Sequence, residues 1–256
     1  MPQPVSLVLI AKNAERTLAR CLDSTRDFAD VVLLDTGSTD RSLELARSFP
    51  HVRVLQGPFV NFSDARNRAA ALALHDWIVP VDADEWLSPE LTAALQRFAP
   101  GATDQVHAFW RINWFAGQRL RSRLGREWIR RVYHRGTVRF EGAVHERLVL
   151  IQGGRPGVAA LEGQIFHEPY ASVGHLFEKR WFYAQPELRG PVAAAHPFAA
   201  SLRAGWRFLR AYLLHGGFMD GWRGFTLAAA DAYGVFLKYV WGYAERRSSS
   251  AQTRGP

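Results

Sequence analysis

Four short apolar runs alternate with helical patterns in the first hundred residues, and this alternation constrains the fold more than any other feature. The runs are rich in Val, Leu and Ile and cover residues 5–10, 31–34, 52–55 and 77–81. Such runs are typical of strands that are buried on both faces. Between the first two, Leu18, Cys21 and Leu22 recur at helical spacing. Strands that alternate with short helices form parallel βαβ units, so we expect an α/β fold built on an open, mostly parallel sheet.

The pattern changes after residue 101. Shorter strand-like segments follow at 106–112, 128–133, 138–140 and 144–151, and helical patterns follow at 172–185, 198–214 and 222–246. Earlier in the chain, Ser63 is expected to cap a helix that ends near residue 74. We predict an α/β half at 1–101, further strands at 102–170, a C-terminal helical region at 171–247 and a disordered tail at 248–256.

Charge and cysteine content narrow the class of protein. The chain has a formal net charge of +8 and a pI of about 10.1, which favour an anionic partner: nucleic acid, an anionic membrane surface or a phosphorylated substrate. No recognised nucleic-acid motif is present, so we expect no nucleic-acid partner. The single cysteine, Cys21, cannot form an internal disulfide, and no basic segment precedes an apolar one at the N-terminus. A cytoplasmic protein is therefore expected.

Polar residues follow three of the expected strands. Residues 11–13 (Ala-Lys-Asn) follow the first, 35–38 (Asp-Thr-Gly-Ser) the second and 82–85 (Asp-Ala-Asp-Glu) the fourth. Ligands of open α/β sheets bind beyond the carboxyl ends of the strands, so these loops are expected to face one crevice. No G-x-G-x-x-G or P-loop sequence follows the first strand, which excludes a dinucleotide-dependent oxidoreductase and a P-loop enzyme.

The acidic segment at 82–85 predicts a metal site. Asp82 and Asp84 repel one another unless a cation lies between them, and Mg²⁺ or Mn²⁺ shared with substrate phosphates suits such a pair. The alternative is a solvated acidic turn ahead of the helix that begins at Ser88 and Pro89.

These motifs together resemble the family 2 inverting glycosyltransferases, which have a GT-A fold. The resemblance rests on residues 6–13, 34–40, Arg66-Asn67 and 81–85, in order and spacing. Three later elements are similar to the bacterial lipopolysaccharide-core β-glucosyltransferase-like branch: Val144-His145-Glu146, His167 with Tyr170 and Ser172, and the Gly-Gly-Phe-x-Asp-Gly run at 216–221. The resemblance implies a GT-A type sheet with a C-terminal helical extension, and a nucleotide-diphosphate sugar donor, most simply a UDP-sugar.

The resemblance also implies which residues bind the donor. Asp35 would bind the nucleoside, with Ala11 and Asn13 near the base and ribose, and Arg66 would approach the nucleotide or its phosphates. Asp84 would be the principal ligand of a divalent metal, Mg²⁺ or Mn²⁺, and Asp82 would contact ribose or metal. His167 resembles a third metal ligand, and a purely structural histidine is the alternative. The chain departs from many members at Thr36, where they carry a second Asp.

An inverting transfer needs a base for the acceptor hydroxyl. Glu146 matches the family's Glu, and His145 is the adjacent alternative. Glu146 could instead be a surface residue paired with Arg147 or Arg139. The diphosphate also needs cations, for which we expect either Arg130 with Arg131 or Lys179 with Arg180.

The C-terminal part has an amphipathic pattern. Leu202, Trp206, Leu209 and Leu213 recur at helical spacing beside Arg203, Arg207 and Arg210. This pattern suits either an anionic membrane surface or a helix whose apolar side faces the core. The resemblance implies a saccharide or lipid-linked acceptor and a role in cell-envelope polysaccharide or lipopolysaccharide-core biosynthesis. Together with such an acceptor, the pattern predicts a peripheral enzyme on the inner face of the cytoplasmic membrane. A catalytically inactive scaffold with the same fold is the alternative.

Overall fold

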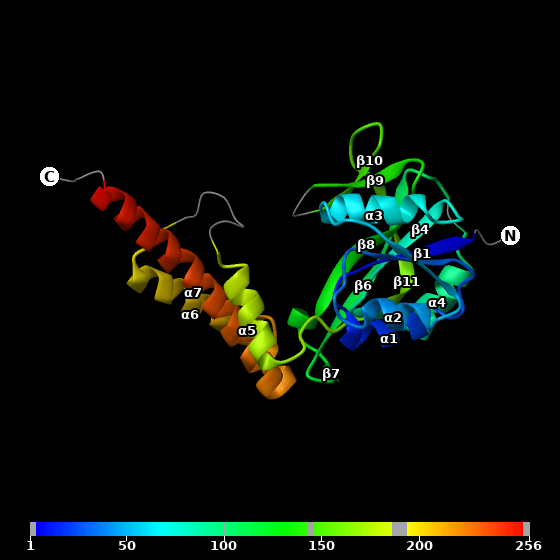
Figure 1. Ribbon diagram of the computed structural model, residues 1–256. Coiled ribbons are helices and arrows are strands. Elements are labelled where there is room, and N and C mark those ends of the chain that lie inside the picture. The colour runs from blue at the N-terminus through cyan, green and yellow to red at the C-terminus, as the bar shows by residue number, and fades with distance from the viewer. Residues whose placement is uncertain (1–3, 100, 143–145, 186–193, 253–256) are drawn as a thin grey trace. The chain divides into compact units, whose positions relative to one another are not determined.

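The computed structural model describes residues 4–99, 101–142, 146–185 and 194–252 of the chain, with side chains described to residue 248 (Figure 1). The chain divides into two compact units, Met1–Ile112 with Glu127–Glu168, and Asn113–Arg126 with Pro169–Pro256. The division after Glu168 lies close to the boundary predicted at 170, whereas the boundary predicted at 101 falls inside the first unit. Two of the predicted residues, Val144 and His145, lie outside the described residues.

The sheet has the strand order β3-β2-β1-β4-β8-β6-β11-β5, with β7 paired to β6. The strands are β1 (Val5–Ala11), β2 (Val31–Asp35), β3 (Val52–Gln56), β4 (Trp77–Asp82), β5 (Glu85–Leu87), β6 (Gln105–Phe115), β7 (Gln118–Arg119), β8 (Arg126–His134) and β11 (Gly157–His167). The first four pair in parallel, β8 runs antiparallel to β4, and β11 runs antiparallel to β5. A separate hairpin joins β9 (Val138–Glu141) to β10 (Arg147–Leu150). The predicted open sheet is confirmed.

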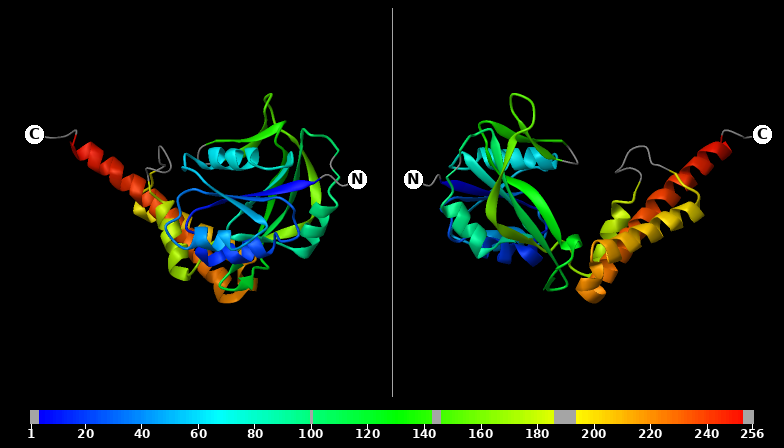
Figure 2. Two further views of the ribbon diagram at one scale, coloured as in Figure 1. Left: turned by 45° about the vertical axis from the view of Figure 1, so that its right-hand side comes forward. Right: turned by 180° about the vertical axis from the view of Figure 1, so that it is seen from behind.

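Helices cover both faces of this sheet, as Figures 1 and 2 show. On one face lie α1 (Glu15–Asp23), α2 (Ser42–Arg47) and α4 (Pro89–Gln96), and on the other lies α3 (Phe62–Ala71). Alternate residues of β1 serve the two cores: Leu7 and Leu9 pack with α1, α2 and α4, whereas Val8 packs with α3. Burial on both faces is the reason why the first strand reads as a continuous apolar run.

The strand β11 was not predicted from the sequence, although it positions part of the site. Its register with β5 places His167 opposite Glu85. Gly163 lies within it at φ +99°, and a Cβ at this position would come within 2.4 Å of the Leu91 backbone. The close approach of α4 therefore requires glycine here, and this glycine interrupts the strand-like pattern of the sequence.

Helix caps explain two of the helix starts. Ser88 accepts a hydrogen bond from the Leu91 N–H at 3.2 Å at the start of α4, as expected. Helix α3 is capped instead by Asn61, whose side chain accepts from the Asp64 N–H at 2.8 Å. Ser63 therefore does not cap the helix, and its hydroxyl donates to the Gly142 carbonyl.

The second unit is mostly helical. It contains η1 (Arg123–Gly125), α5 (Val173–Phe182), α6 (Pro197–Leu209), the π-helical turn η3 (Arg210–Leu214), the 3-10 turn η4 (Gly217–Asp220) and α7 (Gly221–Gln252). Figures 1 and 2 show α6 lying along α7. Asp231 of α7 pairs with Arg180 of α5 at 2.6 Å and with Arg207 of α6 at 2.7 Å. Helix α7 extends past Ser248, where the predicted tail begins, and 253–256 lie outside the described residues.

The amphipathic stripe of the C-terminal region is exposed. Leu202, Trp206, Leu209 and Leu213 are all exposed, with Trp206 at 60%. The buried residues of α6 and η3 are instead small: Ala200, Ala204 and Ala211. The alternative in which these four residues face the core is therefore wrong. Among the described helices, none has the length and apolarity needed to cross a membrane.

Candidate active site

The end of β2 presents a buried carboxylate. Asp35 is 1% exposed, and its Oδ2 accepts hydrogen bonds from the N–H groups of Gly37 and Ser38, both at 3.2 Å. Its Oδ1 finds no hydrogen-bond partner among the described residues. A buried acceptor without a partner is costly in a folded protein. Asp35 therefore has spare capacity to accept a hydrogen bond from a ligand at the sheet edge.

The loops after β1 and β2 are tied together by Asn13. Its Oδ1 accepts from the Thr39 N–H at 2.8 Å, and its own N–H donates to Ser38 Oγ at 2.9 Å. The Ala11 carbonyl accepts from the Thr36 N–H at 2.9 Å and from the Thr36 hydroxyl at 3.1 Å. The side chains of Asn13 and Thr36 thus fix the two loops as one platform, and the predicted contacts of Ala11 and Asn13 with a nucleotide stay predictions.

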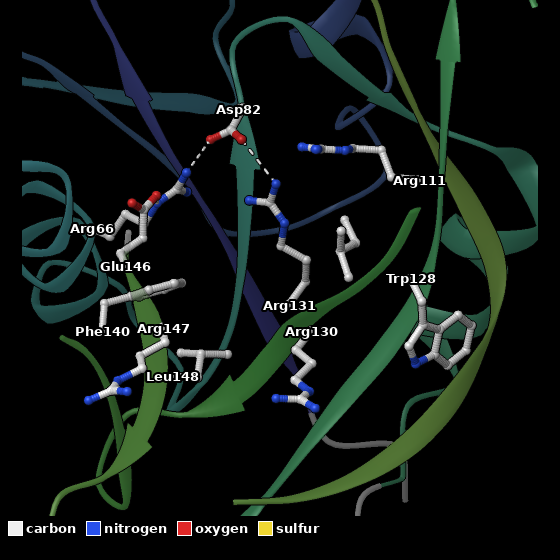
Figure 3. Close-up of a pocket in the computed structure, with 11 residues that line it drawn as sticks. Arg66, Asp82, Arg111, Trp128, Arg130, Arg131, Phe140, Glu146, Arg147 and Leu148 are labelled. Carbon is white, nitrogen blue, oxygen red and sulfur yellow. Dashed lines mark hydrogen bonds and ion pairs between the residues drawn. The ribbon is translucent and has the colours of Figure 1, made fainter. Parts of the chain in front are cut away.

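Two arginines hold the carboxylate of Asp82 at the end of β4. Arg66 of α3 donates from Nη2 to Oδ1 at 2.6 Å, and Arg131 of β8 donates from Nη2 to Oδ2 at 3.0 Å (Figure 3). Both arginines are buried. Arg66 was predicted near the nucleotide or its phosphates, and Arg131 belonged to one of two alternative pairs predicted at the phosphates. In the structure both arginines contact Asp82.

A second carboxylate, that of Glu85, contacts both Arg131 and the backbone of Asp82. Glu85, the first residue of β5, has no solvent exposure. Its Oε1 accepts from Arg131 at 2.9 Å and from Arg111 of β6 at 3.2 Å, and its Oε2 accepts from the Asp82 N–H at 3.0 Å. Sequence reasoning did not assign Glu85 or Arg111 a role. In the structure Glu85 and Leu87 are buried and Trp86 between them is half-buried, so Glu85 lies on the inward face of β5, which no motif in the sequence marked.

The contacts between Asp82 and the two arginines shift the pKa values of Asp82 and Arg131. Burial raises the pKa of Asp82, but the charges of Arg66 and Arg131 outweigh it and hold that pKa well below its usual range. Burial lowers the pKa of Arg131, but Glu85 and Asp82 outweigh it and raise that pKa. Burial raises the pKa of the Cys21 thiol, with smaller effects from Glu85, Asp84 and Asp82. Asp82 and Arg131 are therefore both charged at neutral pH, and Cys21 beside them is a neutral thiol.

Asp84 and His167 lie together beside this network. The Oδ2 of Asp84 is 3.4 Å from Nε2 of His167, and both side chains are partly exposed. The Glu168 N–H donates to the Asp84 carbonyl at 3.0 Å, which ties the end of β11 to the turn between β4 and β5. Across the described residues, no group of three or more His, Cys, Asp and Glu side chains is arranged to hold a metal. Asp84 and His167 are thus two adjacent side chains of types that can bind a metal, and their predicted role as metal ligands stays a prediction.

A pocket of about 430 Å³ opens beside these residues. Its lining includes Arg66, Asp82, Arg131, Glu146 and Arg147, and Glu146 lies beside Arg66 (Figure 3). Glu146 Oε1 is 3.4 Å from Arg66 Nε, in an ion pair whose angles do not make a hydrogen bond. Glu146 is thus brought to the same pocket as Asp82, and it pairs with Arg66 rather than with Arg147 or Arg139.

Lys179 belongs to the second unit. Its Nζ donates to the Pro169 carbonyl at 3.2 Å and lies 5.5 Å from the centroid of the Tyr170 ring. Its role at the donor phosphates stays a prediction. Arg131 of the alternative pair lines the pocket.

Comparison with known proteins identifies the family. Residues 6–146, more than half of the chain, match the family model for glycosyl transferase family 2. The chain belongs to glycosyl transferase family 2. An uncharacterized glycosyltransferase of Rickettsia typhi is 25% identical over 250 residues, which cover 91% of this chain and 85% of that protein. The prophage-derived glycosyltransferase SunS of Bacillus subtilis is 27% identical over 168 residues, which cover 63% of this chain and 39% of SunS.

Glucosyl-3-phosphoglycerate synthase from Mycobacterium tuberculosis, in complex with Mn²⁺, UDP and glucosyl-3-phosphoglycerate, is 24% identical with a TM-score of 0.33. The match covers 45% of this chain and 45% of that synthase.

Family 2 membership confirms the family that the motifs predicted, and the open sheet followed by helices is the predicted GT-A type architecture. The lipopolysaccharide-core branch, the metal ligands and the role of each donor-binding residue are not tested by these comparisons. They remain predictions for this family 2 glycosyltransferase.

Proposed function

We propose that the chain is a metal-dependent inverting glycosyltransferase that transfers a sugar from a nucleotide-diphosphate sugar, most simply a UDP-sugar, to a hydroxyl of a saccharide or lipid-linked acceptor. The observation that carries the proposal is the convergence of Asp82, Arg66, Arg131 and Glu146 on one pocket at the carboxyl end of β4. This is the edge of the sheet at which open α/β folds bind ligands.

Asp84 and His167 fit the divalent metal of this proposal. A carboxylate oxygen and a neutral imidazole nitrogen are ligands that Mn²⁺ accepts, and their partial exposure leaves room for diphosphate oxygens and water. When bound, Mg²⁺ or Mn²⁺ supplies positive charge to the leaving diphosphate. Asp82 is already held by two guanidinium groups, so its role in the proposal is to orient Arg66 and Arg131 and to contact the ribose.

Glu146 is proposed as the base. The acceptor oxygen attacks the anomeric carbon of the donor, and its proton passes to the Glu146 carboxylate. The bond between the anomeric carbon and the diphosphate oxygen breaks on the opposite face, and its electron pair leaves with the nucleoside diphosphate. The new glycosidic bond therefore has the inverted configuration. The guanidinium group of Arg66 lies beside the Glu146 carboxylate and also lines the pocket, so it places a positive charge at both.

The test of the proposal is release of nucleoside diphosphate from a panel of nucleotide sugars. We expect release with Mn²⁺, loss of release after chelation, and a decrease of about 100-fold or more in Asp84→Ala, because loss of a metal ligand removes charge stabilisation from the leaving group. Asp27→Ala is the matched control, since Asp27 is exposed on the first unit away from the pocket.

Two results would argue against the proposal. If nucleoside diphosphate is still released after chelation and in Asp84→Ala, the transfer does not depend on a metal. No release from any nucleotide sugar, with Asp27→Ala and the unmodified chain equally folded and inactive, would favour the catalytically inactive scaffold.

We also propose that the second unit binds an anionic membrane surface. The apolar stripe formed by Leu202, Trp206, Leu209 and Leu213 is exposed, and Arg203 and Arg210 beside it are exposed as well. Further exposed apolar residues of this unit are Phe198, Leu214, Phe218, Met219, Trp222 and Phe225. Exposed apolar surface flanked by arginines is the pattern of interfacial helices. Such a surface would bring the enzyme to a lipid-linked acceptor on the inner face of the cytoplasmic membrane, as in cell-envelope polysaccharide or lipopolysaccharide-core biosynthesis.

Sedimentation with lipid vesicles tests the membrane proposal. We expect binding to vesicles that contain phosphatidylglycerol. The double substitution Trp206→Ser with Leu213→Ser is expected to decrease the partition into vesicles by about 10-fold or more, because each substitution removes exposed apolar area that the membrane would bury. Val60→Ser with Leu74→Ser is the matched control, since both residues are exposed and apolar but lie in the first unit. Equal binding by all three proteins, or no binding by the unmodified chain, would contradict the proposal.

A further inference from the structure

A second pocket, of about 590 Å³, adjoins the one that contains Asp82 and Glu146. The two pockets share the lining residues Arg130, Arg147 and Leu148. Arg139 and Arg155 line only the second pocket, together with Glu141. A molecule in the second pocket would therefore lie next to the proposed donor pocket.

The β9–β10 hairpin directs its charged residues to one face. Arg147 pairs with Glu141, and Val149 pairs with Arg139, whereas Phe140 pairs with Leu148 on the alternate positions. Phe140 and Leu148 are buried, and Arg139, Glu141 and Arg147 are exposed. Because side chains alternate along a strand, the charged residues share the face that is turned away from the core.

The charge of this pocket is strongly positive. Four arginines are set against a single glutamate, and that glutamate lies 3.7 Å from Arg139. Among the described residues, no carboxylate lies within 4.0 Å of Arg130, Arg147 or Arg155. In Figure 3 the guanidinium groups of Arg130 and Arg147 point away from Asp82. The arginines of the second pocket differ in this respect from Arg66 and Arg131, which both form ion pairs with Asp82.

We propose that this second pocket binds a phosphate group of the acceptor, an inference that rests on the proposed transferase function. Guanidinium groups donate paired hydrogen bonds that match phosphate oxygens, and a cluster of arginines with one glutamate favours a dianion over a neutral sugar. Glu146 directly precedes Arg147 in the chain, so a phosphate on Arg147 holds the acceptor beside the proposed base. The acceptor is thus a phosphorylated saccharide or a lipid whose head group carries phosphate.

The experiment measures binding of two probes in the presence of a chelator: glucose 1,6-bisphosphate by calorimetry, and vesicles that contain phosphatidic acid by sedimentation. Arg139→Gln with Arg155→Gln is expected to weaken binding of at least one probe by about 10-fold or more, because each arginine contributes charge-assisted hydrogen bonds. Arg47→Gln with Arg97→Gln removes the same charge from exposed sites elsewhere on the first unit and is expected to change neither probe. Loss of the first probe identifies a phosphorylated saccharide, and loss of the second identifies a lipid phosphate.

The proposal is overturned if neither probe binds, or if the Arg139/Arg155 and Arg47/Arg97 variants weaken binding equally. Binding of UDP with Mn²⁺, measured in parallel, separates this outcome from failure of the proposed function. UDP binding without phosphate-probe binding rejects the acceptor pocket alone. Probe binding that depends on Arg139 and Arg155, without UDP binding, leaves the anion pocket in place and rejects the transferase.

Discussion

Replacing Glu146 with glutamine is expected to lower the turnover of glycosyl transfer by about 100- to 10,000-fold, the range that a positioned general base contributes. Glutamine has nearly the same shape as glutamate but cannot take up the proton of the acceptor hydroxyl. Donor affinity is expected to change little, because Asp82, Arg131 and the proposed metal ligands are left intact. Single-turnover kinetics and UDP binding on the same protein measure the two effects separately.

Glu162→Gln is the control for Glu146, since Glu162 is an exposed glutamate of the first unit on β11. Unchanged turnover in Glu146→Gln would reject Glu146 as the base. The base would then be sought at His145, the alternative predicted from the sequence, which lies outside the described residues. A parallel loss of UDP binding in Glu146→Gln would mean that the residue acts through Arg66, with which it pairs.

Replacing Arg131 with methionine is expected to lower the free energy of unfolding by about 3–5 kcal/mol, a large part of the stability of a typical domain. The substitution leaves the fully buried Glu85 with only Arg111 and the Asp82 N–H as partners. A buried charge that loses its main partner is costly, because water cannot replace that partner. Urea denaturation at pH 7 measures the change.

Arg130→Met tests whether this effect is specific to the buried network, since Arg130 is the exposed neighbour of Arg131 on β8. Its effect on the free energy of unfolding is expected to stay within about 0.5 kcal/mol. Equal destabilisation by the two substitutions would contradict the network.

The pH dependence of the Arg131→Met effect follows from the lowered pKa of Asp82 in the folded state. A carboxylate with a lowered folded-state pKa contributes stability above its unfolded pKa of about 3.9 and loses it as the pH falls. The difference in stability between the unmodified chain and Arg131→Met should therefore be complete near neutral pH and shrink as the pH falls below about 4.

The sequence predicted the parallel half of the sheet because β1, β2 and β4 are buried on both faces and leave continuous apolar runs. It did not predict β11, because Gly163 is required there by the packing of α4, a contact between residues far apart in the chain. It also misplaced the cap of α3, since Asn61 and Ser63 are both capable caps and tertiary contact with Gly142 uses the serine elsewhere.

The sequence predicted several residues of the candidate site, but it did not predict which of them form ion pairs with one another. Asp82, Arg66, Arg131 and Glu146, four of the predicted residues, line one pocket, whereas Ala11, Asn13 and Asp35 are not among the residues that line it. The pairing of Asp82 with two arginines was not predicted, because β8 and α3 reach it from different parts of the chain. Glu85 was not assigned a role for the same reason: its partners Arg111 and Arg131 lie on β6 and β8.

Crystals grown with UDP and Mn²⁺ test the central claim, that this pocket is the donor site of a metal-dependent glycosyltransferase. The anomalous signal of manganese locates the metal independently of any assay of activity. The account predicts a manganese peak within coordination distance of both Asp84 and His167, with the diphosphate of UDP on the metal and next to the pocket lined by Arg66 and Arg131. UDP bound at another surface, or manganese bound away from both Asp84 and His167, would contradict it.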